Sequence, residues 1–240
     1  VLARLKDFQL RTVEFAFRRL FLDQDAVRRF LVADEVGLGK TLVARGVIAK
    51  AVEHLQGTRE RIDIIYICSN ADIAAQNVAR LNVTGKNAFV KATRLTLLPL
   101  EVKCLRKQPI NFISFTPGTT FDHGNRGGQK LERRLIFQML RDQLNLRAKG
   151  LVHVLQGTAG QGWFNEAFEP LDYDEPIAEA FRAAVEGSAF LERLRELTAH
   201  AADGRRTITP EHREEARNLT SELRRTLARC CLSALKPDLV

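Results

Sequence analysis

The sequence predicts an α/β protein in which a parallel sheet with helices, residues 1–122, is followed by a helical insertion, residues 123–235. Three observations indicate this fold class. Apolar runs of strand length alternate with amphipathic helical stretches in the first half. A glycine-rich loop joins one such run to a helix. After residue 122 the apolar residues recur only at helical spacing, until residues 236–240 open what we expect to be the next strand of the sheet.

The elements of the first half follow one another with clear boundaries. The spacing of three and four between apolar residues predicts an amphipathic helix over 4–22. A short apolar run, RRFLVAD at 28–34, predicts the strand before the glycine loop, and 41–56 predicts the helix after it. The isoleucine-rich run at 61–69 is typical of a strand that is buried on both faces of a parallel sheet, and a helix follows at 71–81.

Two more strands and a series of helices complete the expectation. TRLTLLPL at 93–100 and INFISFTP at 110–117 are expected to be strands. In the insertion, helices are expected around Leu135, over 176–200 and over 210–235. Thr209 is the expected N-cap of the last helix, with Pro210 at its first position.

The composition is that of a globular protein. The 240 residues are 45% hydrophobic and 28% charged, and no stretch approaches the run of about 18 apolar residues that a membrane helix needs. The first ten residues do not resemble a secretion signal, so we expect a cytoplasmic protein without a membrane partner. The four cysteines show no metal-ligand spacing, which predicts reduced thiols and no zinc site.

The net charge of +8 is unevenly distributed. Residues 1–130 hold 21 lysines and arginines against 12 acidic residues, whereas residues 131–240 hold 16 against 17. A basic half can attract nucleic acid, but scattered basic residues are equally typical of a solvated surface. The charge alone therefore leaves both interpretations open.

The strongest chemical signal is ADEVGLGKT at 33–41, a Walker A-like phosphate loop. Phosphate binding needs backbone amides that glycine turns inward at a helix N-terminus, a lysine that reaches the outer phosphates, and a hydroxyl that ligates magnesium. The strict pattern would place glycine where this chain has Asp34. The expected cofactors are ATP and Mg²⁺, with Lys40 and Thr41 as the catalytic positions and Thr41 as the metal ligand. The expected cofactor contacts in this loop are Val36, Gly37, Leu38, Gly39, Lys40 and Thr41.

This loop resembles that of superfamily-2 helicases and translocases (DEAD/DEAH-like ATPases), particularly the Swi/Snf-type remodelling ATPases, which carry a near-identical D-E-x-G-L-G-K-T. The resemblance covers residues 5–120 and implies the N-terminal RecA-like lobe of an ATP hydrolase that translocates on or unwinds nucleic acid, more often DNA than RNA. Those enzymes have an aromatic-Gln pair about thirty residues before the loop, and Phe8-Gln9 stands 31 residues before Lys40. The resemblance therefore implies that Gln9 reads the adenine edge.

Two further segments are similar to nucleic-acid contacts of this superfamily. The strand end and helix at 61–81 imply contacts from Ser69, Asn70 and Gln76, although a plain helix N-cap at 69 or 70 explains these residues equally well. SFTPGT at 114–119 is similar to the T-P-G element that grips a phosphate. The candidates in that element are Thr116, Gly118 and Thr119.

One departure from the family concerns hydrolysis. The superfamily needs an Asp-Glu pair at the end of a buried strand, and Asp174-Glu175 lies in a turn-rich stretch without such a strand. We therefore expect the sequence to stop just before its hydrolytic acids and to lack the second RecA-like lobe, so that this chain alone hydrolyses no ATP. The five histidines have no partner at ligand spacing.

Two alternatives stay open. The first is a P-loop ATPase that acts on protein partners, and the second is a nucleotide-binding interaction module without hydrolysis. Salt-sensitive DNA binding by the basic half would separate the proposed helicase from the first alternative. The residues after Val240 would decide the second, because an interaction module would not need an Asp-Glu pair there.

Overall fold

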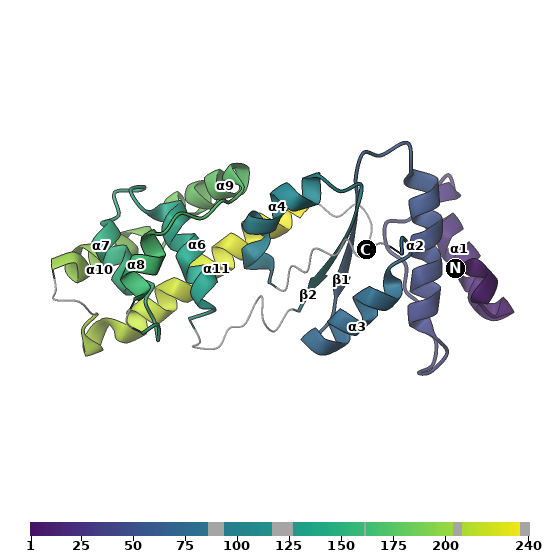
Figure 1. The fold of residues 1–240 in the computed structure, drawn as a ribbon, viewed down its shortest axis with the longest axis horizontal. Helices are drawn as coiled ribbons and strands as arrows, with labels where there is room; N and C mark the ends of the chain where they lie inside the picture. The colour runs from purple at the N-terminus through teal and green to yellow at the C-terminus, as the bar shows by residue number, and fades with distance from the viewer. Residues whose placement is uncertain (86–93, 117–126, 161, 204–207, 236–240) are drawn as a thin grey trace. The chain divides into compact units, whose positions relative to one another are not determined.

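The computed structural model describes residues 1–85, 94–116, 127–160, 162–203 and 208–235, and it is a mixed helical and sheet structure (Figure 1). Helix accounts for 62% of it, and a two-stranded parallel sheet supports the predicted α/β class. The chain divides into two compact units. The first comprises Val1–Thr93, Cys104–Thr116 and Lys236–Val240, and the second comprises Arg94–Lys103 and Pro117–Leu235.

The sheet of the first unit forms as the isoleucine-rich runs predict. Strand β1 (Ile62–Ile67) pairs in parallel with β2 (Ile110–Phe115), so that Ile62 lies opposite Ile110 and Ile67 opposite Phe115. Helix α3 (Ala71–Leu81) packs on this sheet through a core of Val78, Leu81 and Phe112. The strands predicted at 61–69 and 110–117 are thus confirmed over Ile62–Ile67 and Ile110–Phe115, and the helix predicted at 71–81 is confirmed over Ala71–Leu81, whereas Pro117 lies outside the described residues.

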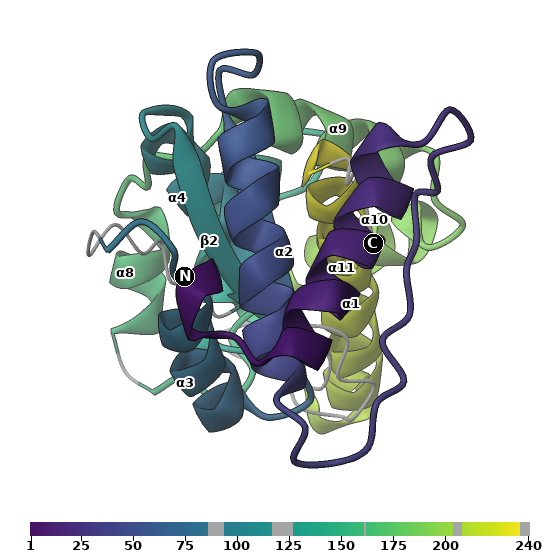
Figure 2. The ribbon, with the colours of Figure 1, turned by 90° about the vertical axis from the view of Figure 1, so that its right-hand side faces the viewer.

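Two helices of the first unit pack closely, and Figure 2 shows them side by side. These are α1 (Asp7–Phe17), which continues as the π-helical turn η2 (Arg18–Leu22), and α2 (Lys40–Leu55). Helix α1 buries Val13 against α2, where a Cβ at Gly46 would lie only 2.6 Å from a Val13 methyl group. Glycine at position 46 therefore lets helix α1 approach helix α2 closely.

The predictions of two strands are wrong. Residues 28–34 form no strand, because no neighbouring strand among the described residues pairs with them, and Leu31 is 84% exposed. The expected strand at 93–100 is a 3₁₀ turn, η3 (Leu95–Leu97), followed by helix α4 (Leu98–Arg106). The buried aliphatic side chains here are Leu95, Leu98, Val102 and Leu105, whose spacing of three and four is helical. The adjacent leucines at 97 and 98 conceal this period in the sequence.

In the second unit, helices joined by turns and irregular segments make up the described residues, and no strand occurs among them. The buried faces of α6 and α11 provide much of its core, with Leu135, Phe137 and Leu223 fully buried. Among the described residues no helix is both long and apolar enough to cross a bilayer. The helices are η3, most of α4, α6 (Lys130–Leu140), α7 (Ala148–Val154), α8 (Trp163–Phe168), α9 (Glu175–Glu186), α10 (Leu191–Asp203), η4 (Pro210–His212) and α11 (Arg213–Leu235).

Candidate functional site

The glycine-rich loop ends at the N-terminus of α2. Gly37 and Gly39 have φ of +91° and +81°, a left-handed conformation that residues with a Cβ rarely adopt. Gly39 is the N-cap of α2, and a Cβ there would lie 2.6 Å from the side-chain nitrogen of Gln9. Both the backbone conformation and the space therefore require glycine at position 39.

Lys40 bends its side chain back over this loop. Its Nζ donates to the backbone carbonyl oxygens of Asp34 and Glu35 at 2.8 and 3.0 Å. The side chain is exposed, so an anion that reached it would exchange these two neutral acceptors for charged ones, which bind an ammonium group more strongly. Thr41 is half-buried in the first turn of α2, whereas the side chain of Val36 lies almost wholly in solvent.

Gln9 connects α1 to the loop. Its Oε1 accepts a hydrogen bond from the Lys6 amide at 3.0 Å, and its Nε2 donates to the carbonyl of Leu38 at 2.9 Å. The structure thus brings together Gln9 and Leu38, two predicted site residues that are 29 positions apart. A primary amide has two donor hydrogens and two acceptor lone pairs, so each atom keeps one for a ligand, but the residue is only 5% exposed. In this structure Gln9 holds the loop, and only a small part of its surface is accessible.

The residues that the sequence predicts to contact nucleic acid divide into three groups. Ser69, Asn70 and Thr116 lie where β1 and β2 end, and these strand ends adjoin because the Cys68 amide donates to the Phe115 carbonyl at 3.1 Å. Gln76 is exposed on α3, one to two turns beyond its start. Gly118 and Thr119 lie outside the residues that the structure describes.

Asn70 and Thr116 have structural roles in this arrangement. Asn70 caps α3, because its Oδ1 accepts from the amides of residues 72 and 73 at 2.8 and 3.0 Å. Thr116 is 4% exposed. Ser69 and Asn70 are both exposed at this edge, but the Asn70 Oδ1 already accepts the two capping bonds of α3.

The donor set of the loop fits a nucleotide phosphate with magnesium. Backbone amides at a helix N-terminus, an ammonium group and a first-turn hydroxyl are the groups that such a ligand needs. Throughout the described ranges no cluster of three or more His, Cys, Asp or Glu side chains could hold a metal by itself. A magnesium ion at this loop would therefore be held by Thr41 together with the phosphate oxygens.

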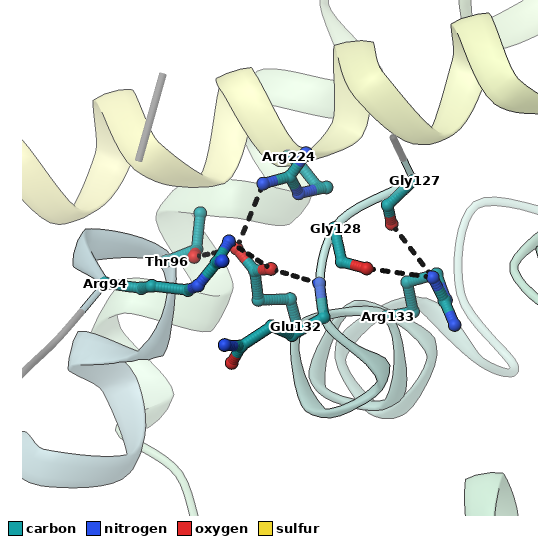
Figure 3. Close-up of polar contacts among 8 residues, drawn as sticks. Arg94, Thr96, Gly127, Gly128, Glu132, Arg133 and Arg224 are labelled. Atoms are coloured by element: carbon teal, nitrogen blue, oxygen red, sulfur yellow. Dashed lines mark hydrogen bonds and ion pairs between the residues drawn. The ribbon is translucent and has the colours of Figure 1, made fainter. Parts of the chain in front are cut away.

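The structure also shows a buried ionic cluster that the sequence did not indicate, in the second unit. Glu132 in α6 is fully buried, and Figure 3 shows the side chains of Arg94, Thr96 and Arg224 converging on its carboxylate. The distances are 3.1 Å from Arg94, 2.5 Å from Thr96 and 3.3 Å from Arg224. Glu132 also accepts from the backbone amide of residue 129 at 2.5 Å. These donors come from η3, α6 and α11, which lie far apart in the sequence, so no local spacing could reveal them.

Arg133, the neighbour of Glu132, occupies a different environment. Its guanidinium donates to the carbonyls of Gly127 and Gly128 at 3.2 and 3.0 Å and lies over the ring of Trp163. Burial lowers the pKa of Arg133, and the nearby charge of Arg224 lowers it further. The cluster is thus rich in buried positive charge, which Glu132 partly compensates.

No protein-family model, no curated protein and no solved structure matches this chain. The left-handed glycines, Lys40 and the Gln9 contact are therefore the observations on which a function can be based.

Proposed function

We propose that this chain binds ATP with Mg²⁺ and is the ATP-binding, RecA-like lobe of a nucleic-acid-dependent ATPase, a helicase or translocase that acts on duplex DNA. The single observation that carries the proposal is the loop at 33–41, with Gly39 in a left-handed N-cap at the start of α2 and the Lys40 amine folded over the loop carbonyls. Its backbone amides and helix dipole favour an anion at this point.

Each residue of the loop has a distinct role in this proposal. Lys40 binds the outer phosphates and gives up its two carbonyl partners when it does so. Thr41 supplies a hydroxyl to the magnesium ion, which neutralises phosphate charge when bound. Val36, Gly37 and Leu38 contribute backbone amides, for which their side-chain chemistry matters little.

Gln9 is proposed to act in two ways. It positions the loop through its bond to the Leu38 carbonyl, and it uses its remaining donor and acceptor to read the adenine edge. The two roles predict different results for Gln9→Ala, because a lost adenine contact weakens ATP more than GTP, whereas a displaced loop weakens both equally.

Nucleic acid is proposed to lie at the carboxyl ends of β1 and β2. Ligands of open α/β sheets bind beyond these ends, and the charge excess of the chain lies in its first 130 residues. Ser69 is exposed there, whereas Asn70 and Thr116 would act through the backbone geometry that they hold. If this surface binds DNA, its affinity should fall steeply with salt, whereas an ATPase that acts on proteins should show little DNA binding at any salt concentration.

Nucleotide binding tests the proposal directly. The affinity for Mg²⁺-ATP should be measured by calorimetry for the wild type and for Lys40→Ala, with Lys107→Ala as the control because Lys107 is an exposed lysine of the same unit. We expect Lys40→Ala to lower the affinity at least tenfold, which corresponds to about 1.4 kcal/mol. Gly39→Ala should also lower it, because of its left-handed φ and its 2.6 Å approach to Gln9. Equal affinities of the two lysine variants, or no binding by the wild type, would refute the proposal.

A further inference from the structure

Two histidines that are 12 residues apart meet in the second unit. His200 lies near the end of α10 and His212 at the end of η4, just before α11. Their ring centroids are 4.6 Å apart and their planes are tilted by 42°. The ring contacts of His54 and His153 are with phenylalanine rings instead. The pairing of 200 and 212 thus creates a site that sequence spacing did not predict.

Thr209 fixes the orientation of one ring. Its hydroxyl lies 2.8 Å from Nδ1 of His212, within hydrogen-bonding distance. When Nδ1 carries the proton and donates to Thr209, the lone pair is on Nε2, which is the form that a metal ion requires. A hydrogen bond to the second ring nitrogen is the usual outer-shell support of a histidine ligand.

The separation of the rings suits two adjacent positions around a metal ion. A metal–nitrogen bond of about 2.0–2.1 Å places the ion about 3.2 Å from each ring centroid. Two rings at right angles about the metal would then have centroids about 4.5 Å apart, whereas tetrahedral ligands would be about 5.2 Å apart. The observed 4.6 Å is closer to the value for the right-angle arrangement that square-planar and octahedral ions adopt than to the tetrahedral value.

We propose that His200 and His212 form a binding site for a divalent first-row transition ion, with Cu²⁺ and Ni²⁺ preferred to Zn²⁺. No third His, Cys, Asp or Glu joins them within the part of the chain that the structure describes, so water completes the coordination. The bound ion would tie the end of α10 to the start of α11. This site is separate from the phosphate loop, which belongs to the other unit.

Metal titration of the intact chain, purified without a histidine tag, tests the site. Calorimetry with Cu²⁺, Ni²⁺ and Zn²⁺ should show one ion per chain, with the affinity decreasing from Cu²⁺ to Ni²⁺ and from Ni²⁺ to Zn²⁺. His200→Ala and His212→Ala should each lower the affinity for Ni²⁺ at least tenfold. Thr209→Val should lower it as well while leaving both ligands in place.

A matched control and a structural check make the outcome decisive. His54→Asn removes an exposed histidine of the other unit and should leave the Ni²⁺ affinity unchanged. Circular dichroism of each variant shows whether it is folded. If His200→Ala and His212→Ala are folded and bind Ni²⁺ as the wild type does, or if His54→Asn lowers the affinity as much as they do, the proposal is wrong.

Discussion

Glu132 should be the acidic residue on which the stability of the second unit depends most. Its carboxylate accepts from two arginines, from Thr96 and from a backbone amide, and its side chain is fully buried. Glu132→Gln keeps the size of the side chain but removes the charge and turns one acceptor into a donor. The change removes the buried negative charge that lies 3.3 Å from the guanidinium of Arg224, whose side chain is only 4% exposed.

The magnitude follows from the burial of both partners. Removal of one member of a buried ion pair costs about 3–5 kcal/mol, because the remaining charge is left uncompensated. We therefore expect Glu132→Gln to lower the free energy of unfolding by at least about 3 kcal/mol, which with a urea m-value of about 1–3 kcal/mol/M shifts the midpoint by about 1 M or more. Arg133 is also buried near Arg224, and its positive charge adds to the unfavourable charge that remains after Glu132→Gln.

Intrinsic fluorescence provides the assay. Trp163 is the one tryptophan of the chain and is buried in the second unit, so its emission during urea unfolding reports on this unit. Glu166→Gln is the control, because Glu166 forms an exposed ion pair with Lys130, and such a pair contributes at most about 1 kcal/mol. If Glu132→Gln costs no more than Glu166→Gln, the cluster around Glu132 does not stabilise the unit as we argue.

Helix packing, thiol burial and histidine burial provide three further tests. Gly150→Ala should destabilise the second unit by more than about 3 kcal/mol in urea, because its Cβ would lie 1.6 Å from a backbone carbonyl oxygen of α10, whereas Gly160→Ala, which meets no atom within 4 Å, should have little effect. Cys104 is exposed and should react with a thiol reagent in the native protein, whereas Cys231 should react only in urea, since burial raises its pKa. Burial lowers the pKa of His153, so the unfolded chain binds a proton at this residue before the folded chain does as the pH falls below about 6.5. The free energy of unfolding should therefore decrease between about pH 7 and pH 5.5 in the wild type, and it should decrease less in His153→Gln. Equal losses for the two glycine variants, equal native reactivity of the two thiols, or the same pH dependence in both proteins would contradict these expectations.

The features that depend on neighbours in the sequence could be predicted. The helix at 71–81, the strand at 61–69 and their order follow from apolar periods of 3.6 and from β-branched runs. Glycine at positions 37 and 39, just before a helix, is compatible with the left-handed conformation that both residues adopt. Each of these features is decided by local sterics or by the spacing of side chains along one element.

The strand expected at 93–100 shows where local patterns fail. A short run of leucines fits a strand and a helix equally well, and the burial of Leu95 and Leu98 decided between them. The run at 28–34 has the composition of a strand, yet a strand needs a partner to accept its hydrogen bonds. Neither outcome could be predicted from the local sequence, because both depend on which other segments of the chain pack against these residues.

Only the tertiary structure decided which distant polar groups meet. Gln9 reaches the Leu38 carbonyl across 29 residues, and Arg224 reaches Glu132 across 92. His200 and His212 come together although they lie 12 positions apart in the sequence. Such contacts arise from the path of the chain and from the need to satisfy polar groups that packing has removed from water, and this need appears only once the core has formed.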